Sequence, residues 1–356
     1  MIAKMYFDIA RLKFEGKGLV DINDGTVILS NDSKTLPNYC NSTLLQEYGQ
    51  SINRHPDNSR VFALAEFKLS GEGIIAPDKF HDDYLKEFSR RSEHLKSFLI
   101  FLWFVQDNSV GLYGTYGHIP EMKIVNGKSR SLVSYMSDGS SNEVVFSKQQ
   151  LVEASDWTIL YSKITGYKYD ADFNTSIIYD YNQPNVSAKG VVLKTNIDFN
   201  YNDITAIDRA LHFLSIARGH NLLFYKIAFY MPVIECLFGT KGNDLTYRVS
   251  LWAACYLTDI PEERESARKD FITAYNIRSR FIHGQAVESD ITNDKLAPLS
   301  VRIDKHIRTI LKKAIKYDSI IFNKYKTEQR EAYCNSLVLG NEFDHATILN
   351  IIHKTE

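Results

Sequence analysis

The sequence has few of the features that mark a secreted, membrane-spanning or disulfide-bonded protein. Its four cysteines are scattered through 356 residues without a Cys-x-x-Cys pair, which favours buried free thiols in a reducing cytoplasm. No apolar run approaches the ~20 residues of a membrane-spanning helix. The first eight residues lack a long apolar stretch, so we expect no signal peptide. These absences predict a cytoplasmic protein with no membrane partner.

Common catalytic and cofactor-binding motifs are also missing. The chain contains no P-loop, no His-Glu-x-x-His and no Gly-x-Ser-x-Gly. Gly71-Glu72-Gly73 follows a predicted strand, but Ala76 stands where a dinucleotide-binding fingerprint has its third glycine, and Pro77-Asp78 restarts the chain, which favours a loop. His81-Asp82-Asp83 is better interpreted as a helix start than as a metal site. We therefore predict no metal and no cofactor.

The first half of the chain predicts many short strands around one long helix. Hydrophobic content of 44% and charged content of 24% are those of an ordinary globular protein, and the length has room for two domains. The helix is expected over 78–107, with its later part, 93–105, in the core. Residues 167–188 suit a linker or irregular edge strands. Segments rich in β-branched or aromatic residues predict strands over 5–14, 26–30, 60–69, 143–146 and 158–164.

From residue 202 onward the pattern is helical throughout. One helix is expected around the stripe of Ile204, Ile207, Leu211 and Leu214, with Asn202 or Asp203 as its N-cap. Further helices are expected over 222–238, 245–257, 261–283 and 298–324, with a short one after 327. Their short joins predict an up-and-down bundle. We thus predict an α+β protein with a β-rich domain over 1–198, an all-α bundle over 199–326, and a C-terminal helix and tail over 327–356.

The end of the predicted helix 261–283 combines a guanidinium with an imidazole. At about 100° per residue, one stripe of this helix contains Phe271, Tyr275, Arg278 and Ile282. Arg278 therefore has apolar neighbours, among which a guanidinium is costly to bury without an anion. His283 lies in the last turn, whose dipole favours a protonated imidazole, and Gly284 suits a left-handed C-cap. A cation and an imidazole at a helix end suit a phosphate site.

The segment 278–284, Arg-Ser-Arg-Phe-Ile-His-Gly, resembles the Arg-x4-His signature of the HEPN superfamily of helical domains. Segments 233–239 and 245–251 are similar, in order and spacing, to the preceding helices of the ApeA-like HEPN subgroup, so the resemblance covers about 203–325. It implies a homodimeric, metal-independent endoribonuclease that acts on RNA, with defence against phage as its setting. The N-terminal domain would then be a sensor or a brake.

The resemblance implies that Arg278 and His283 are catalytic, with each pair facing its counterpart across a dimer cleft. An imidazole can move the protons of RNA cleavage, typically worth ~10²–10⁴-fold, while a guanidinium clamps phosphate oxygens. The residues also allow a structural alternative, in which Arg278 pairs with a carboxylate such as Glu235 and His283 only caps the helix. Ser279, Glu235 and Arg248 match supporting positions, although an ion pair within the bundle explains Glu235 and Arg248 equally well.

The predicted helix 298–324 has a basic face opposite an apolar one. The basic residues are Lys305, Arg308, Lys312 and Lys316, and the apolar ones are Ile303, Ile307, Ile310, Ala314 and Ile321. The basic face either binds RNA phosphates by releasing counterions or is simply solvated. Because the formal net charge is only −1, any nucleic-acid-binding surface has to be local. The alternative for the whole protein is a non-catalytic HEPN module that dimerises and binds a nucleotide or a protein.

Overall fold

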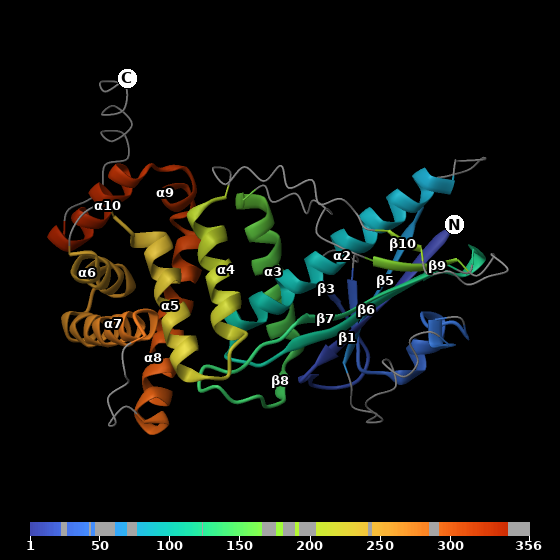
Figure 1. Cartoon of the computed structure of the whole chain (residues 1–356), viewed down its shortest axis with the longest axis horizontal. Helices are drawn as coiled ribbons and strands as arrows, with labels where there is room; N and C mark the ends of the chain where they lie inside the picture. The colour runs from blue at the N-terminus through green and yellow to red at the C-terminus, as the bar shows by residue number, and fades with distance from the viewer. Residues whose placement is uncertain are drawn as a thin grey trace, which may run out of the picture. The chain divides into compact units, whose positions relative to one another are not determined.

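The computed structural model describes residues 1–22, 27–42, 44–46, 61–69, 77–122, 124–165, 176–180, 189–191, 204–240, 244–284 and 292–340 (Figure 1). An antiparallel sheet region with helices precedes an all-helical region, so the predicted α+β class is confirmed. The chain divides into two compact units. The sheet unit comprises Met1–Ser134 and Ser141–Phe199, and the helical unit comprises Tyr135–Ser140 and Asn200–Glu356.

Within its described residues, the sheet unit contains an eight-stranded antiparallel sheet and a parallel pair. The large sheet has the order β10-β9-β7-β6-β1-β5-β4-β3, and β2 pairs with β8. The strands are β1 (Ile2–Ala10), β2 (Leu12–Phe14), β3 (Leu19–Ile22), β4 (Val27–Ser30), β5 (Phe62–Lys68), β6 (Gly111–Ile119), β7 (Ile124–Leu132), β8 (Val144–Phe146), β9 (Ser176–Asp180) and β10 (Lys189–Val191). The helices are η1 (Ser33–Asn38), α2 (Pro77–Val105), η2 (Pro120–Met122) and α3 (Lys148–Thr165).

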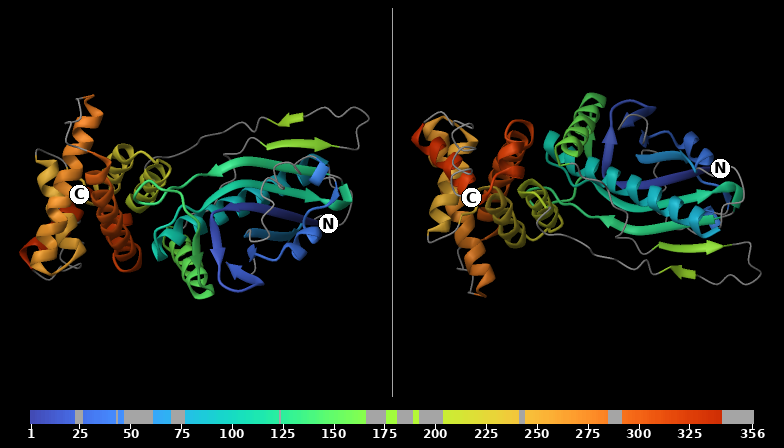
Figure 2. Two further views of the ribbon diagram at one scale, coloured as in Figure 1. Left: turned by 90° about the horizontal axis from the view of Figure 1, so that it is seen from below. Right: turned by 90° about the horizontal axis from the view of Figure 1, so that it is seen from above.

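The alternation of side chains along β1 supplies both faces of the sheet. Met5 and Phe7 lie in a core cluster with residues of α2, which runs along this face (Figure 2). Tyr6 points to the opposite face and packs in a second cluster with Phe62 and Tyr116. Helix α2 approaches β6 so closely at Gly117 that an added Cβ would lie 2.6 Å from the Tyr84 hydroxyl. The predicted long helix is therefore confirmed as the core of this unit.

Two predictions for the first half need correction. The strand expected over 158–164 is wrong, because these residues belong to α3. Leu151, Ala154, Thr158 and Tyr161 form its buried stripe at helical spacing, which outweighs the β-branched composition. The strand expected over 5–14 is two strands, separated at Arg11, whose φ of 58° is left-handed. The Gly-x-Gly segment and most of the predicted linker lie outside the described residues.

The helical unit is built around α5. Its helices are α4 (Ala206–Arg218), α5 (Leu223–Phe238), α6 (Leu245–Leu257), α7 (Pro261–Ile282), α8 (Asn293–Lys316), α9 (Ser319–Lys324) and α10 (Thr327–Leu339). Helix α5 contacts α4, α6, α7, α8 and α10, and its residues Ile227, Met231 and Ile234 are buried. Among the described residues, no helix combines the length and the apolarity needed to cross a membrane.

Most of the predicted helix ends lie close to the observed ones. The N-cap of α4 is Thr205, not Asn202 or Asp203, because the Thr205 hydroxyl and the Asp208 carboxylate form a reciprocal capping box. The helix expected over 298–324 begins earlier, at Asn293, and stops at Lys316, so Ile321 belongs to α9. Gly284 follows α7 with a φ of 62°, so the predicted left-handed C-cap is confirmed.

The segment Tyr135–Ser140 is held in the helical unit by hydrogen bonds to its backbone groups. The Tyr135 amide donates to the Arg218 carbonyl at 2.8 Å, and the Tyr135 carbonyl accepts from the buried Lys226 ammonium at 3.3 Å. The Ser300 hydroxyl donates to the Ser137 carbonyl at 2.6 Å. These contacts explain why a segment from the first half of the chain belongs to this unit.

Candidate functional site

Arg278 lies on α7 and forms an ion pair with Glu235 on α5. Its Nη1 is 3.1 Å from Glu235 Oε1, and the two side chains remain 27% and 19% exposed. The guanidinium carbon lies 6.0 Å from the ring centre of Tyr275. Burial, reinforced by the negative charge of Glu235, raises the pKa of the Tyr275 phenol, which therefore stays neutral. The Glu235 pairing considered from the sequence is thus present, but it leaves the guanidinium accessible.

The stripe of α7 predicted around Arg278 is only partly buried. Phe271 and Tyr275 are core residues, as expected, but Ile282 is exposed, because the buried face of this helix ends at Ile277. Arg278 therefore sits at the edge of the core rather than inside it. A guanidinium at such an edge keeps access to solvent and to ligands.

His283 is the C-cap residue of α7. Its backbone amide donates to the Ser279 carbonyl at 3.1 Å, and the side chains of both residues are exposed. No side chain among the described residues forms a hydrogen bond with the imidazole. The imidazole is thus free to meet a ligand or a second chain at the end of the helix.

Arg278 opens onto a pocket of about 550 Å³ that lies between helices of the helical unit. Its polar lining residues are Arg209, Glu235, Thr240, Arg278, Thr327 and Arg330, and its apolar ones include Phe213, Pro232 and Leu245. His283 is not among them, so the structure places the two predicted catalytic residues on one helix but not in one pocket. Arg209 and Arg330 were not predicted as site residues, since the sequence separates them by more than a hundred positions.

Cys236 also lines this pocket, but its thiol has low reactivity. Burial raises the pKa of the thiol to about 11, despite the opposing charge of Arg209 nearby. At neutral pH the sulfur is protonated and a poor nucleophile. The pocket is therefore suited to binding through its arginines rather than to thiolate chemistry.

The other predicted site residues lie on separate surfaces. Arg248 is exposed on α6, and its side chain forms no hydrogen bond, ion pair or ring contact with any described residue. On α8, Lys305 and Lys316 are exposed, and the Lys316 ammonium lies 5.1 Å from the centre of the Tyr317 ring. The predicted apolar face is confirmed for Ile303, Ile307, Ile310 and Ala314, which are all buried.

Arg308, predicted on the basic face of α8, is engaged within the protein. Its guanidinium pairs with the buried carboxylate of Asp304, one turn earlier on the same helix. Asp304 also accepts a hydrogen bond from the Tyr230 hydroxyl at 2.7 Å. Lys312 is half-buried and has a partner of its own. The exposed cations of this face are therefore Lys305 and Lys316.

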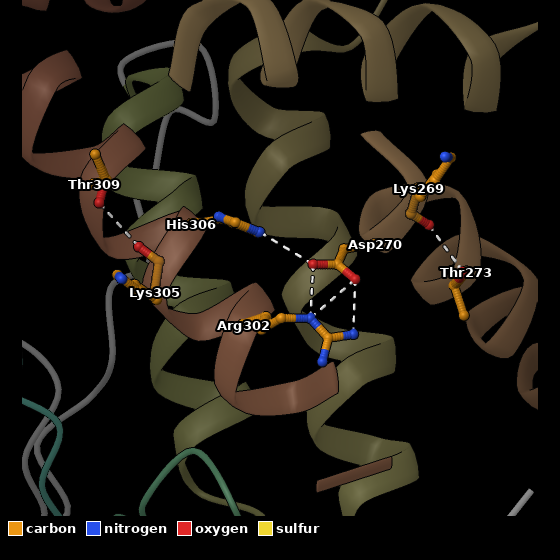
Figure 3. A network of polar contacts seen from close by, with 7 residues as sticks. All are labelled: Lys269, Asp270, Thr273, Arg302, Lys305, His306 and Thr309. Atoms are coloured by element: carbon orange, nitrogen blue, oxygen red, sulfur yellow. Dashed lines mark hydrogen bonds and ion pairs between the residues drawn. The ribbon is translucent and has the colours of Figure 1, made fainter. Parts of the chain in front are cut away.

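A second charged cluster joins α7 to α8, as Figure 3 shows. The Asp270 carboxylate accepts two-pronged hydrogen bonds from Arg302, at 2.8–3.1 Å, and lies 3.2 Å from His306 Nε2. Burial alone would raise the pKa of Asp270, but the hydrogen bonds and charges of His306 and Arg302 outweigh it and lower that pKa. This cluster is a closed ion-pair network between two helices.

Comparisons with protein-family models, with curated proteins and with solved structures find no match for this chain. Among the described residues, no group of three or more His, Cys, Asp or Glu side chains could hold a metal ion.

Proposed function

We propose that this protein is a metal-independent endoribonuclease of the HEPN type, which acts on RNA as a homodimer. The observation that carries the proposal is the position of Arg278, which lines a pocket whose described residues supply more positive than negative charge. His283 lies exposed at the end of the same helix. In the proposed dimer, the two copies of this helix end meet, and their imidazoles face the scissile phosphate from opposite sides.

The ion pair with Glu235 is compatible with phosphate binding by Arg278. Partly exposed pairs of this kind contribute only about 0–1 kcal/mol, so a phosphate can replace the carboxylate at little cost. The carboxylate meanwhile holds the guanidinium toward the pocket in the absence of substrate. Arg278 would then stabilise the negative charge that grows on the phosphate oxygens in the transition state.

The proposed reaction uses the 2′-hydroxyl of the RNA as its nucleophile. One His283 accepts the proton of this hydroxyl, its oxygen bonds to phosphorus, and the 5′-oxygen leaves with a proton from the partner's His283. The products are a 2′,3′-cyclic phosphate and a 5′-hydroxyl. We further propose a role in defence against phage, with the sheet unit as sensor or brake, and RNA contacts from Lys305, Lys312, Lys316 and Arg308, of which Lys305 and Lys316 are the exposed ones.

The second candidate is a non-catalytic module that dimerises and binds a nucleotide or a protein. The Arg278–Glu235 ion pair favours it, because the pair gives Arg278 a structural role within one bundle. The location of His283 outside the pocket also favours it, since no base then stands beside the guanidinium.

Cleavage of RNA by the His283→Ala variant separates these candidates. We expect a loss of about 10²–10⁴-fold relative to wild type, because the imidazole moves protons in the transition state. The matched control is His212→Ala, an exposed histidine on α4, which should cleave normally. Wild-type cleavage should survive EDTA and leave 2′,3′-cyclic ends. Wild-type rates from His283→Ala, or no cleavage by the wild-type dimer, would overturn the catalytic assignment.

A further inference from the structure

The pocket beside Arg278 contains more positive charge than its described residues neutralise. Three guanidiniums line it, from Arg209, Arg278 and Arg330, against the single carboxylate of Glu235. That carboxylate pairs with Arg278. No carboxylate of the described residues lies within ion-pair distance of Arg209 or Arg330. The lining thus carries three positive charges and one negative charge.

Arg209 and Arg330 repel each other across this pocket. Burial lowers the pKa of Arg330, and the positive charge of Arg209 lowers it further, while the negative charge of Glu328 offsets these effects only in part. Two like charges held together at a partly buried site destabilise the folded chain unless an anion offsets them. The arrangement therefore suits a bound anion better than an empty pocket.

Hydrogen bonds to backbone carbonyls account for only part of this arrangement. Arg330 Nη1 donates to the Cys236 carbonyl at 3.1 Å, near the C-terminus of α5, and Arg209 Nη1 donates to the Ile204 carbonyl at 2.7 Å. Each bond uses one of several N–H donors on a guanidinium. Donors therefore remain for a ligand.

The rest of the lining indicates what kind of anion fits. Thr327, the first residue of α10, lines the pocket, so the positive end of that helix dipole adds to the arginines. Phe213, Pro232 and Leu245 give apolar surface for an organic group. A volume of about 550 Å³ falls in the usual range for small-molecule sites and exceeds what a bare inorganic anion requires.

We propose that this pocket binds the terminal phosphate of an organic phosphomonoester, with Arg209 and Arg330 as its principal ligands. A phosphomonoester carries about −1.5 to −2 charge at neutral pH, which matches the excess of two positive charges in the lining. An internal phosphodiester of RNA carries only one negative charge. Guanidiniums bind such a group through paired N–H donors. The proposal does not depend on RNA cleavage, because it assigns no role to His283.

The test measures whether binding depends on the terminal phosphate. For the full chain, titration calorimetry compares adenosine 5′-monophosphate with adenosine. For the His283→Ala protein, which should leave RNA intact, anisotropy compares one RNA oligonucleotide with a 5′-phosphate or a 5′-hydroxyl. We expect the phosphate to tighten binding about tenfold or more in at least one comparison. A preference confined to the nucleotide identifies a free small molecule as the source, and one confined to the RNA identifies a strand end.

Two pocket variants and one control complete the test. Arg330→Gln and Arg209→Gln should each abolish the preference, whereas Lys324→Gln, at an exposed lysine of α9 outside the pocket, should keep it. Making both variants protects the test against one that fails to fold. Equal binding with and without the phosphate, or a preference that survives in both variants, overturns the proposal. Neither result bears on cleavage, which is read out separately through His283.

Discussion

Helix α7 carries two charged clusters that differ in how far their charges are neutralised. Near the middle of the helix, Asp270 receives hydrogen bonds from Arg302 and His306 at 2.8–3.2 Å (Figure 3). Two turns later, Arg278 makes a single ion pair and lines a pocket with two further arginines. The first cluster has direct partners for its buried charge, while the second has cations in excess.

This difference indicates different uses for the two clusters. A buried carboxylate with direct cationic partners stabilises the packing of α7 on α8 and needs no ligand. Guanidiniums that line a pocket without a carboxylate partner repel one another, and an anion that binds there removes this repulsion. In this molecule, the cluster whose positive charges exceed their local partners is therefore a better candidate for a binding site than the cluster whose charges are paired.

The largest effect on stability is expected from Asp270→Ala. This change removes three hydrogen bonds to Arg302 and the contact with His306. We expect the free energy of unfolding to fall by about 2–3 kcal/mol, since Arg302 is half exposed and regains water while His306 does not. Denaturant titrations followed by the helical circular-dichroism signal measure it. Glu265→Ala, which breaks an exposed pair on the same helix, is the control and should cost about 0.5 kcal/mol or less.

A smaller effect on the free energy of unfolding is expected when a fall in pH protonates Asp270 in the same cluster. Because the pKa of Asp270 is lower in the folded chain, its contribution to stability is fully present above the unfolded value of about 4 and is lost as pH falls through the folded value. The difference in free energy of unfolding between wild type and Asp270→Asn should therefore narrow below about pH 4. A constant difference across that range would show that the charge of Asp270 does not stabilise the cluster.

The helical unit could be predicted closely from the sequence because its signals are local. The helix expected over 245–257 matches α6, and that over 222–238 differs from α5 by one residue. Apolar residues at helical spacing and the short join after Phe238 fixed these ends. The sheet unit was harder. Strand β6 contains Gly111, Gly114 and Gly117, and its sequence does not predict a strand because glycine is depleted in strands. In the structure these glycines allow close packing of neighbouring groups.

The candidate site was only partly visible in the sequence. Arg278 was predicted from its local spacing to His283, but His283 does not line the pocket, which instead contains Arg209 from α4 and Arg330 from α10. Only tertiary packing brings those two together, so no periodicity or motif could reveal them. For Arg308 the sequence prediction failed in the opposite way, because this residue was expected on a free basic face and instead has a partner within the protein. Asp304 stands one turn before it, at the spacing of an ion pair on a helix, and that signal predicts an internal partner rather than a free cation.

The smallest effect on stability is expected when one arginine of the pocket is replaced by glutamine. This result would distinguish the two clusters most clearly. Arg209→Gln and Arg330→Gln each remove one hydrogen bond to a backbone carbonyl, and each also relieves the repulsion between the two guanidiniums. These terms oppose each other, so the free energy of unfolding without ligand should change by about 1 kcal/mol or less. The same denaturant titrations measure it beside Asp270→Ala. A loss as large as that of Asp270→Ala would mean that the pocket arginines are structural, and the contrast between the two clusters would then fail. A small change together with lost phosphate binding would assign these arginines to the ligand.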